Sequence, residues 1–517
     1  MATSMFGTNN GTIENIVFED CSFTGSVVET NMQTVDNIVL NTTKLTAPVV
    51  NQNAGMVSNI AMNAGCDVTF PAPEAATNFG FIVGGNAGTV TKCTNAIVYE
   101  KTIASTPKAS CNFGGIVGAT TGLVSDCSFT GTFDMTIDAP QKSQYHTFGG
   151  VVGYFKGTKD QVMVSGCTNS GNVKVTNNTQ VLIATGGVVG GTTSVAKATG
   201  DYGVVENCEN TGNVGMRFIA GGSGSYPVCG GVCGYIEGYI KDCTNRGNIS
   251  MQCDGSSAWT AAKFGGVAGI VNMGAKNCHN YGTFEFVKGN FAGGTEAARF
   301  SGSVNFSCWA GVIAAAGSWN TSVNSVFEDC TNEVDMVYNP GSTTGTPQFA
   351  FGGVFGWLNG TAKNCVNKSS VTANTNTQYV NLGGISAGGN AHFEDCQNLG
   401  AIVLNSNNVI VPAKWLARVG GITGWNAALA STAAATTPTA INAKMTNCTN
   451  SGSVTVNGGS ATSSNQSFVG GICGTGVNSK KTGSVTFEGC TNTGVITTPA
   501  DYAKLQKGNI SGDDNDL

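Results

Sequence analysis

Apolar residues return along this chain in a fixed relation to a recurring cysteine. The clearest copy runs from Phe264 to Phe284 and reads FGGVAGIVNMGAKNCHNYGTF. Three residues before the cysteine and six residues after it, every one of twelve copies is apolar. Cysteine is itself small and readily buried, so three positions in each copy are predicted to face an interior. The twelve cysteines are Cys21, Cys93, Cys127, Cys167, Cys208, Cys243, Cys278, Cys330, Cys365, Cys396, Cys448 and Cys490.

The spacing of three residues between the first apolar position and the cysteine predicts a bend. On one straight strand an odd spacing would send the two side chains to opposite faces. The residue just before the cysteine is Asp, Asn or Gly in every copy except that with Lys92, and these types best tolerate a left-handed backbone. We expect a corner there, with the cysteine pointing inward from the next strand. A glycine four residues after the cysteine in nine copies predicts a second corner.

Asparagine and glycine complete the repeat. Asparagine stands two residues after the cysteine in ten copies, and inward-facing asparagines stacked on one another can hydrogen-bond through their amides. A Gly-Gly-x-x-Gly element, whose missing side chains permit close backbone approach, is predicted to supply a third strand. The pattern therefore predicts an all-β, right-handed parallel β-helix of about 12 turns, stabilised by stacking of its turns. The predicted structural ladder comprises Cys127, Cys167, Cys208, Cys243, Cys278, Cys330, Cys365, Cys396, Cys448 and Cys490 with Asn169, Asn210, Asn245, Asn280 and Asn450.

Regularity varies along the chain. Residues 1–110 are predicted to form irregular N-terminal turns, residues 111–497 the regular turns, and residues 498–517 a solvated C-terminal tail. Charged residues are 11% of the chain and the net charge is −6, which excludes a disordered polyelectrolyte and argues against nucleic-acid binding. No apolar run is long enough to predict a membrane span, and the start MATSMFGTNNGT shows no signal peptide.

The nineteen cysteines are predicted to be reduced packing residues. Cys229 and Cys233 lack the second Cys or His pair of a zinc finger, so neither a metal site nor a cofactor is predicted. The three histidines, His146, His279 and His392, are predicted to be isolated surface residues, since none belongs to a triad-like arrangement.

Aromatic residues give the main candidate for binding. Tyr154, Tyr235, Trp357 and Trp425 each directly follow the last glycine of a Gly-Gly-x-x-Gly element. A column of exposed rings along one edge could stack on sugar faces; alternatively, the rings cover a corner of the core. The aspartates before the cysteines alternate with Asn and Gly, so a turn role explains them, although clustered carboxylates also serve in polysaccharide-active β-helix enzymes.

Units such as GGVCGYIEGYIKDCTNRGNI (Gly230 to Ile249) and GGVFGWLNGTAKNCVN (Gly352 to Asn367) resemble GLUG-type repeats. The resemblance covers roughly residues 5 to 497 and implies a β-solenoid scaffold from a large secreted or cell-surface bacterial protein, often adhesin-like. Some such repeats flank peptidase domains, but this chain has no HExxH motif.

These observations predict a non-enzymatic, secreted or cell-surface scaffold that binds glycans or surface proteins through its corner loops. Two alternatives stay open. One is a polysaccharide-active lyase or hydrolase, which would need carboxylates from adjacent turns to converge in one groove. The other is a structural subunit that associates end to end, because open turns present unpaired strand edges.

Overall fold

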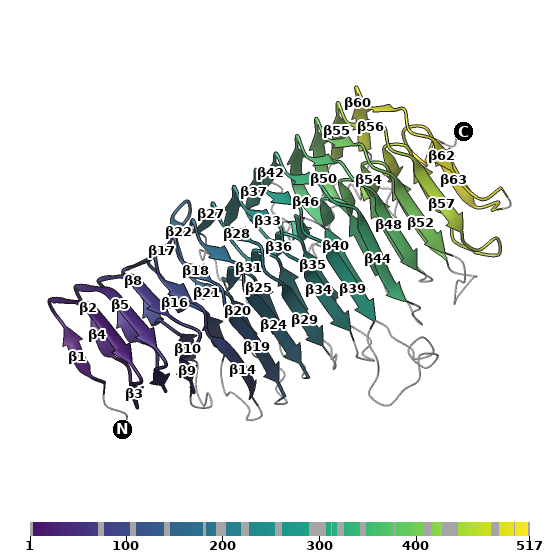
Figure 1. The fold of residues 1–517 in the computed structure, drawn as a ribbon. Helices are drawn as coiled ribbons and strands as arrows, with labels where there is room; N and C mark the ends of the chain where they lie inside the picture. The colour runs from purple at the N-terminus through teal and green to yellow at the C-terminus, as the bar shows by residue number, and fades with distance from the viewer. Residues whose placement is uncertain are drawn as a thin grey trace, which may run out of the picture. The chain divides into compact units, whose positions relative to one another are not determined.

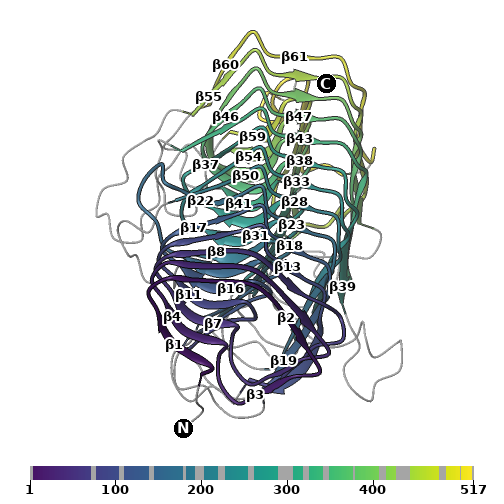
Figure 2. The same ribbon diagram turned by 60° about the vertical axis from the view of Figure 1, so that its left-hand side comes forward.

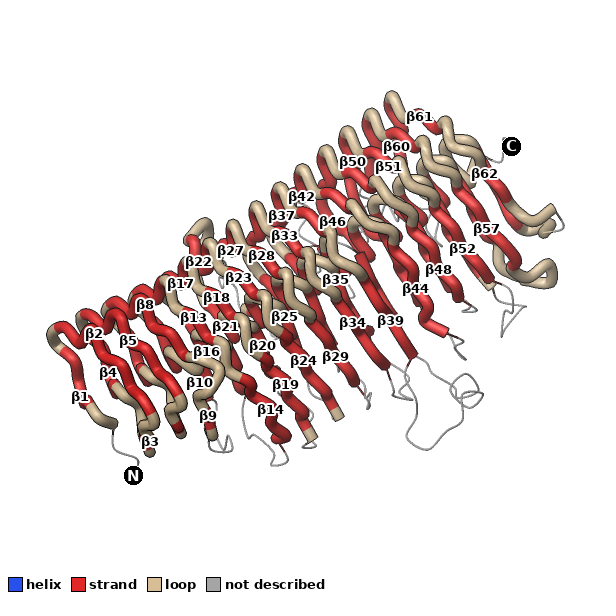
Figure 3. Tube along the Cα trace, viewed as in Figure 1, coloured by secondary structure: helices blue, strands red, loops and turns tan. Residues whose placement is uncertain are grey.

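A computed structural model describes most of the chain, and within it every regular element is a β-strand (Figure 3). The described residues are 4–70, 77–103, 110–138, 145–178, 182–192, 203–218, 227–253, 261–288, 307–311, 313–317, 325–341, 348–375, 379–406, 415–426, 443–476, 485–500 and 502–514. They include no helix of the length and apolar character that crossing a membrane requires.

The chain forms two compact units. Unit 1 is Met1–Ala220 with Gly224–Ser250, and unit 2 is Gly221–Ser223 with Met251–Leu517. Inside each unit the strands of one turn pair in parallel with the matching strands of the next turn, so that equivalent strands lie side by side (Figure 1). Each unit is therefore a parallel β-helix, which confirms the predicted fold class. We call one turn of this helix a coil.

A regular coil contains five short strands, where the sequence predicted three. In unit 1 one coil consists of β15 (Cys111–Gly114), β16 (Val117–Thr120), β17 (Leu123–Ser125), β18 (Ser128–Phe129) and β19 (Thr132–Ile137). The next coil repeats these as β20 (Tyr145–Gly149), β21 (Val152–Phe155), β22 (Val162–Ser165), β23 (Thr168–Asn169) and β24 (Asn172–Asn177). Figure 2 shows the corners of successive coils following one another within a unit. Loops of different lengths leave from these corners, which explains the unequal spacing of the repeats.

The Gly-Gly-x-x-Gly element joins two strands and does not form a third strand by itself. β15 ends at Gly114, the first glycine of the pair, and β16 begins at Val117, so the second glycine, Gly115, lies in the turn. A Cβ on Gly114 would lie 1.9 Å from the Val117 carbonyl oxygen, and one on Gly118 would lie 2.7 Å from the backbone of Asn78. Only glycine permits such contact between backbones. We call this tight strand–turn–strand unit the arch.

The first coils differ from the predicted alignment. Phe6 pairs with Val28 and Val28 with Val50, so a 22-residue coil without a cysteine follows the first one. The interior position occupied by cysteine elsewhere is held by isoleucine here, in the register Ile16, Ile38, Ile60 and then Cys93. Cys21 consequently is not in register with Cys93, Cys127 and the later cysteines of unit 1. The prediction failed here because isoleucine fills the same buried position without marking it.

Within residues 498–517, which were predicted to be a solvated tail, the described residues 502–514 form part of the fold. β63 (Leu505–Gly508) pairs in parallel with β58 (Ser467–Gly470). The carboxylate of Asp513 accepts hydrogen bonds from Thr475 Oγ1 at 2.9 Å and from the Gly476 N–H at 2.8 Å. The segment GNISG repeats the spacing of GGICG one coil earlier, which is why it can form another arch.

Stacked aromatic rings and asparagine amides fill the interior. In unit 1 the Phe113 ring stacks on Phe79 at 4.6 Å and on Phe148 at 4.9 Å. Asn169 Nδ2 donates to Asn210 Oδ1 at 2.6 Å, and Asn210 Nδ2 donates to Asn245 Oδ1 at 2.7 Å. Unit 2 has the same arrangement, so the predicted asparagine ladder is confirmed. In unit 2, amide–amide hydrogen bonds join Asn332, Asn367, Asn398, Asn450 and Asn492 in this order.

A second asparagine ladder, which the sequence analysis missed, lies in the first coils of unit 1. Its bonds run from Asn9 to Asn31, from Asn31 to Asn53 and from Asn53 to Asn86, at 2.8, 2.8 and 2.7 Å. Asn86 Nδ2 then donates to Thr120 Oγ1 at 2.9 Å. These asparagines are the last residues of β1 (Phe6–Asn9), β4 (Val28–Asn31), β7 (Val50–Asn53) and β11 (Val83–Asn86). They do not lie at the corner after the cysteine, so a search centred on cysteine did not find them.

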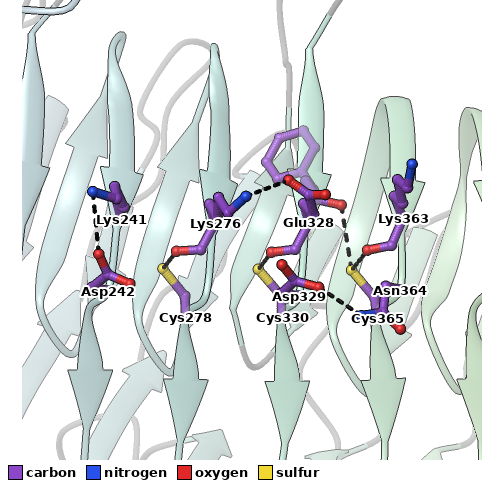
Figure 4. Close-up of polar contacts among 11 residues, drawn as sticks. Lys241, Asp242, Lys276, Cys278, Glu328, Asp329, Cys330, Lys363, Asn364 and Cys365 are labelled. Atoms are coloured by element: carbon purple, nitrogen blue, oxygen red, sulfur yellow. Dashed lines mark hydrogen bonds and ion pairs between the residues drawn. The ribbon is translucent and has the colours of Figure 1, made fainter.

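The corner before the cysteine adopts the left-handed conformation that its residue types predicted. In unit 2 the φ angles of Asn277, Asp329 and Asn364 are 51°, 55° and 50°. Each following cysteine donates from Sγ to the carbonyl oxygen two residues before it, at 3.4 Å for Cys278 and 3.3 Å for Cys330 (Figure 4). Burial raises the pKa of the Cys330 thiol well above its usual range. The thiol therefore stays protonated and acts as a weak hydrogen-bond donor.

Candidate functional site

The four aromatic residues predicted as a platform occupy equivalent positions in the arches. In unit 1, Tyr154 on β21 pairs with Gly191 on β26 (Val189–Gly191), which pairs with Tyr235 on β31 (Cys233–Ile236). In unit 2, Trp357 pairs with Gly388, which pairs with Trp425. Each unit thus has two rings separated by one glycine along the same column.

In unit 1 the rings pack mainly into the protein. Tyr235 is only 6% exposed, and its ring meets that of Tyr145 edge-on at 6.2 Å. The Tyr235 hydroxyl donates to the Glu237 carboxylate, and the Glu237 N–H donates to Thr192 Oγ1 at 2.7 Å. Tyr154 is half-buried. This arrangement agrees more closely with rings that cover the core than with an exposed platform.

In unit 2 the two tryptophans form a pair on strands two coils apart. Trp357 lies on β46 (Phe355–Lys363) and Trp425 on β54 (Thr423–Asn426), with β50 (Ser386–Glu394) between them. Their ring centroids are 5.6 Å apart at an interplanar angle of 76°. A Cβ on Gly388 would lie 3.0 Å from Trp357 Cζ3, so the glycine makes room for the ring. Both indoles are half-buried and keep contact with solvent.

The arch brings a cation onto this aromatic pair. Arg418 lies on β53 (Leu416–Gly420), two residues before the Gly-Gly turn, and Trp425 follows that turn. A Cβ on Gly424 would lie 2.5 Å from the Arg418 carbonyl oxygen, so the two strands touch and their outward side chains face each other. The guanidinium carbon of Arg418 lies 4.3 Å from the centroid of the Trp425 ring, which is a cation–π contact.

The polar surroundings of Arg418 consist of neutral groups. Arg418 Nη1 donates to the side-chain oxygen of Asn381, which is its register partner on β49 (Tyr379–Gly383), at 3.3 Å. Arg418 Nε and Trp425 Nε1 are buried and have no hydrogen-bond partner. Burial lowers the pKa of Arg418 to about 10, so the side chain is still a cation at neutral pH.

The sequence analysis did not single out Arg418 or Asn381, because among the residues around the Gly-Gly-x-x-Gly element it considered for binding only the aromatic residues that follow its last glycine. One sequence signal could have found the arginine. The residue two before the Gly-Gly pair and the residue after the final glycine are seven apart, and the arch places them opposite each other. Arg418 and Trp425 have this spacing.

The histidines occupy three different environments. His146 lies on β20 and is only 1% exposed, which corrects the prediction of a surface residue. Its Nδ1 accepts the Cys111 backbone N–H at 3.1 Å, and burial lowers its pKa to about 4. His279 contacts Thr331 Oγ1 and Asn277 Oδ1 at 2.6 and 2.9 Å. His392 belongs to β50, where its Nδ1 accepts the Lys444 N–H at 3.2 Å. None of these described contacts joins a histidine to a carboxylate.

The corner aspartates lie apart from the arch. In unit 2 they alternate with asparagines along the column, and Asn364 Nδ2 donates to Asp329 Oδ1 at 2.6 Å while Asn447 Nδ2 donates to Asp395 Oδ1 at 3.1 Å. Within the described ranges, no group of three or more His, Cys, Asp or Glu side chains is arranged to hold a metal ion. The outer surface beside the corners carries ion pairs between neighbouring coils, such as Lys276 with Glu328 at 2.9 Å (Figure 4).

Comparison with known proteins adds no relative: no family profile, no curated protein and no solved structure matches the chain.

Proposed function

We propose that this chain is a non-enzymatic, adhesin-like β-helix scaffold of a secreted or cell-surface protein, and that it binds carbohydrate. The observation that carries the proposal is the pair of half-exposed indoles at Trp357 and Trp425. Indole faces suit the apolar faces of sugar rings, because an aromatic side chain buries a large area and loses little conformational entropy. The resemblance to GLUG-type repeats supports the surface location.

The rigidity of the strands that carry the two tryptophans favours the proposal of carbohydrate binding. Trp357 and Trp425 project from strands two coils apart, at roughly 9.6 Å for a strand spacing of about 4.8 Å. A parallel ladder fixes that separation, so binding would require little reorganisation of the protein. Such a surface suits an extended ligand that contacts more than one coil.

The enzyme alternative receives no support from the corner aspartates. Polysaccharide-cleaving sites need two carboxylates facing one bond, at separations of roughly 5–10 Å. In unit 2, Asp329 and Asp395 are instead each followed along the column by an asparagine that donates to the carboxylate.

The proposal is tested by measuring binding of the full chain to an oligosaccharide array, followed by titration calorimetry on the best ligands. We expect Trp425→Ala and Trp357→Ala each to weaken binding by tenfold or more. Tyr281→Ala is the matched control, because Tyr281 is an exposed aromatic residue of unit 2 outside the arch. If the native chain bound no oligosaccharide at millimolar concentration, or if both tryptophan variants bound as the native chain does, the proposal would be wrong.

A further inference from the structure

Arg418 differs from the lysines of unit 2 that pair with carboxylates at the surface. Lys276, Lys368 and Lys444 each contact a glutamate within 2.9 Å. Arg418 is half-buried in the arch, and none of the described residues around it forms an ion pair with it. Burial lowers its pKa. Removing a cation from water without a counter-charge is unfavourable.

The groups that contact Arg418 compensate this loss only in part. The Trp425 ring at 4.3 Å and the Asn381 oxygen at 3.3 Å stabilise the guanidinium, but neither carries a negative charge. Buried Nε has no acceptor at all. Asp513 lies on the same side of unit 2, beyond Thr475, which is the register partner of Trp425. Its carboxylate is already held by Thr475, Gly476 and Ser511.

We propose that the missing counter-charge comes from the ligand, and that this arch binds an anionic saccharide. This inference rests on the proposed function. Sugar rings would pack against the indoles of Trp357 and Trp425, and a carboxylate or sulfate group of the saccharide would meet the Arg418 guanidinium. A planar guanidinium donates two parallel hydrogen bonds to such an oxyanion. Phe468, the half-exposed register partner of Arg418 on the next coil, extends the apolar surface beside the cation.

The equivalent column of unit 1 shows which feature is specific. There the ring–glycine–ring arrangement of Tyr154, Gly191 and Tyr235 is the same. The residues opposite, at the position of Arg418, are Thr147, Ala184 and Val228. Glu237 lies beside the Tyr235 hydroxyl. This side of unit 1 would repel an anion, so selection for charge is assigned to the Arg418 arch.

The experiment measures binding of the full chain to matched saccharides by calorimetry. One pair is an oligogalacturonate and its carboxyl-reduced counterpart, and a second pair is a sulfated and an unsulfated oligosaccharide of one backbone. We expect the native chain to prefer an anionic member at least tenfold in 50 mM NaCl, with a preference that falls as salt rises. The pair that shows this preference identifies the oxyanion as carboxylate or sulfate.

Three variants assign the preference to the guanidinium. Arg418→Gln should lose the preference for the anionic member, and Arg418→Lys should keep only part of that preference because the planar fork is lost. Lys444→Gln, which removes an exposed cation elsewhere in unit 2, should bind as the native chain does. Equal affinity of the native chain for anionic and neutral members, or an unchanged preference in Arg418→Gln, would overturn the inference and leave carbohydrate binding standing. Absence of binding to every saccharide would overturn both.

Discussion

Removing one amide from the buried asparagine ladder should destabilise this protein far more than removing an asparagine from its surface. Asn398 is 0% exposed. Its Nδ2 donates to Asn450 Oδ1 at 2.6 Å and to the Gly400 carbonyl at 2.8 Å, and its Oδ1 accepts from Asn367 Nδ2 at 2.7 Å. The substitution Asn398→Ala therefore removes three hydrogen bonds and leaves a partner group unsatisfied at each one.

The magnitude follows from these three groups. Each hydrogen bond contributes about 1 kcal/mol net, and each partner left buried without a bond loses about 1–3 kcal/mol. We expect Asn398→Ala to lower the free energy of unfolding by about 3–5 kcal/mol, after allowing for partial relaxation. The control is Asn405→Ala. Asn405 donates to Asn374 at 2.7 Å and accepts from Asn457 at 2.8 Å, but this outer ladder is half-exposed or exposed. Water can replace its bonds, so the loss should be below about 1 kcal/mol.

Equilibrium urea unfolding of the full chain, followed by far-UV circular dichroism, measures both variants. Because coils stack on their neighbours and unfolding need not be two-state, hydrogen exchange read by mass spectrometry should accompany it. Faster exchange is expected in β47 (Val366–Asn367), β51 (Gln397–Asn398) and β56 (Thr449–Asn450) of Asn398→Ala only. Equal destabilisation by the two substitutions, or unchanged exchange in these strands, would refute the view that the buried ladder holds the coils together.

Three further predictions concern single features of the fold. Gly131→Ala should destabilise unit 1 by at least about 2 kcal/mol in thermal or urea unfolding, because the new Cβ would lie 2.0 Å from the Ile97 carbonyl oxygen. Gly11 has open space around it, so the control Gly11→Ala should change stability by less than about 1 kcal/mol. Equal effects of the two substitutions would contradict the argument from close backbone approach. His146 has a pKa of about 4 in the fold against an ordinary 6.5, so the unfolded chain takes up the proton first as pH falls, and the free energy of unfolding should decline by about 3 kcal/mol between pH 6.5 and 4. The dependence of this free energy on pH should be weaker in His146→Gln and unchanged in the control His392→Gln. The same slope in His146→Gln as in the native chain would show that His146 is not responsible. Iodoacetamide labelling of the native chain should modify the half-exposed Cys21 first. Cys490 is also half-exposed but should react more slowly, because its contact with Cys448 raises the pKa of its thiol. Buried thiols such as Cys208 and Cys330 should react only after unfolding, and rapid native labelling of either would contradict the closed interior.

The sequence pattern predicted part of the architecture. The recurrence of cysteine, asparagine and glycine at fixed offsets specified a parallel β-helix, because a position that must be buried, bent or free of a side chain accepts few residue types. The left-handed corner was predictable in the same way: Asp329 and Asn364 have φ angles of 55° and 50°, which few other side chains tolerate. In the first coils Ile16, Ile38 and Ile60 occupy the interior position that cysteine occupies elsewhere. A search for the cysteine pattern therefore did not detect one of these coils.

The candidate site shows the opposite balance. Sequence spacing identified Trp357 and Trp425 as members of one column, since each follows the last glycine of its own Gly-Gly-x-x-Gly element. It did not place Arg418 on the indole of Trp425, because that contact depends on how closely two strands approach across the Gly-Gly turn. It also did not identify Asn381 as the acceptor for Arg418 Nη1, because register between coils is set by pairing of whole strands and not by neighbours in sequence.

The sequence by itself therefore determined the class of fold, since each coil repeats the same local demands of burial, left-handed backbone and missing side chain. Only the tertiary structure decided how many strands form a coil, which residues share a column in the first coils, that the last residues add another arch, and that His146 is buried. The physical reason is that these features arise from contacts between coils. Such contacts join residues tens of positions apart, with loops of variable length between them, and the pattern of one repeat does not record them.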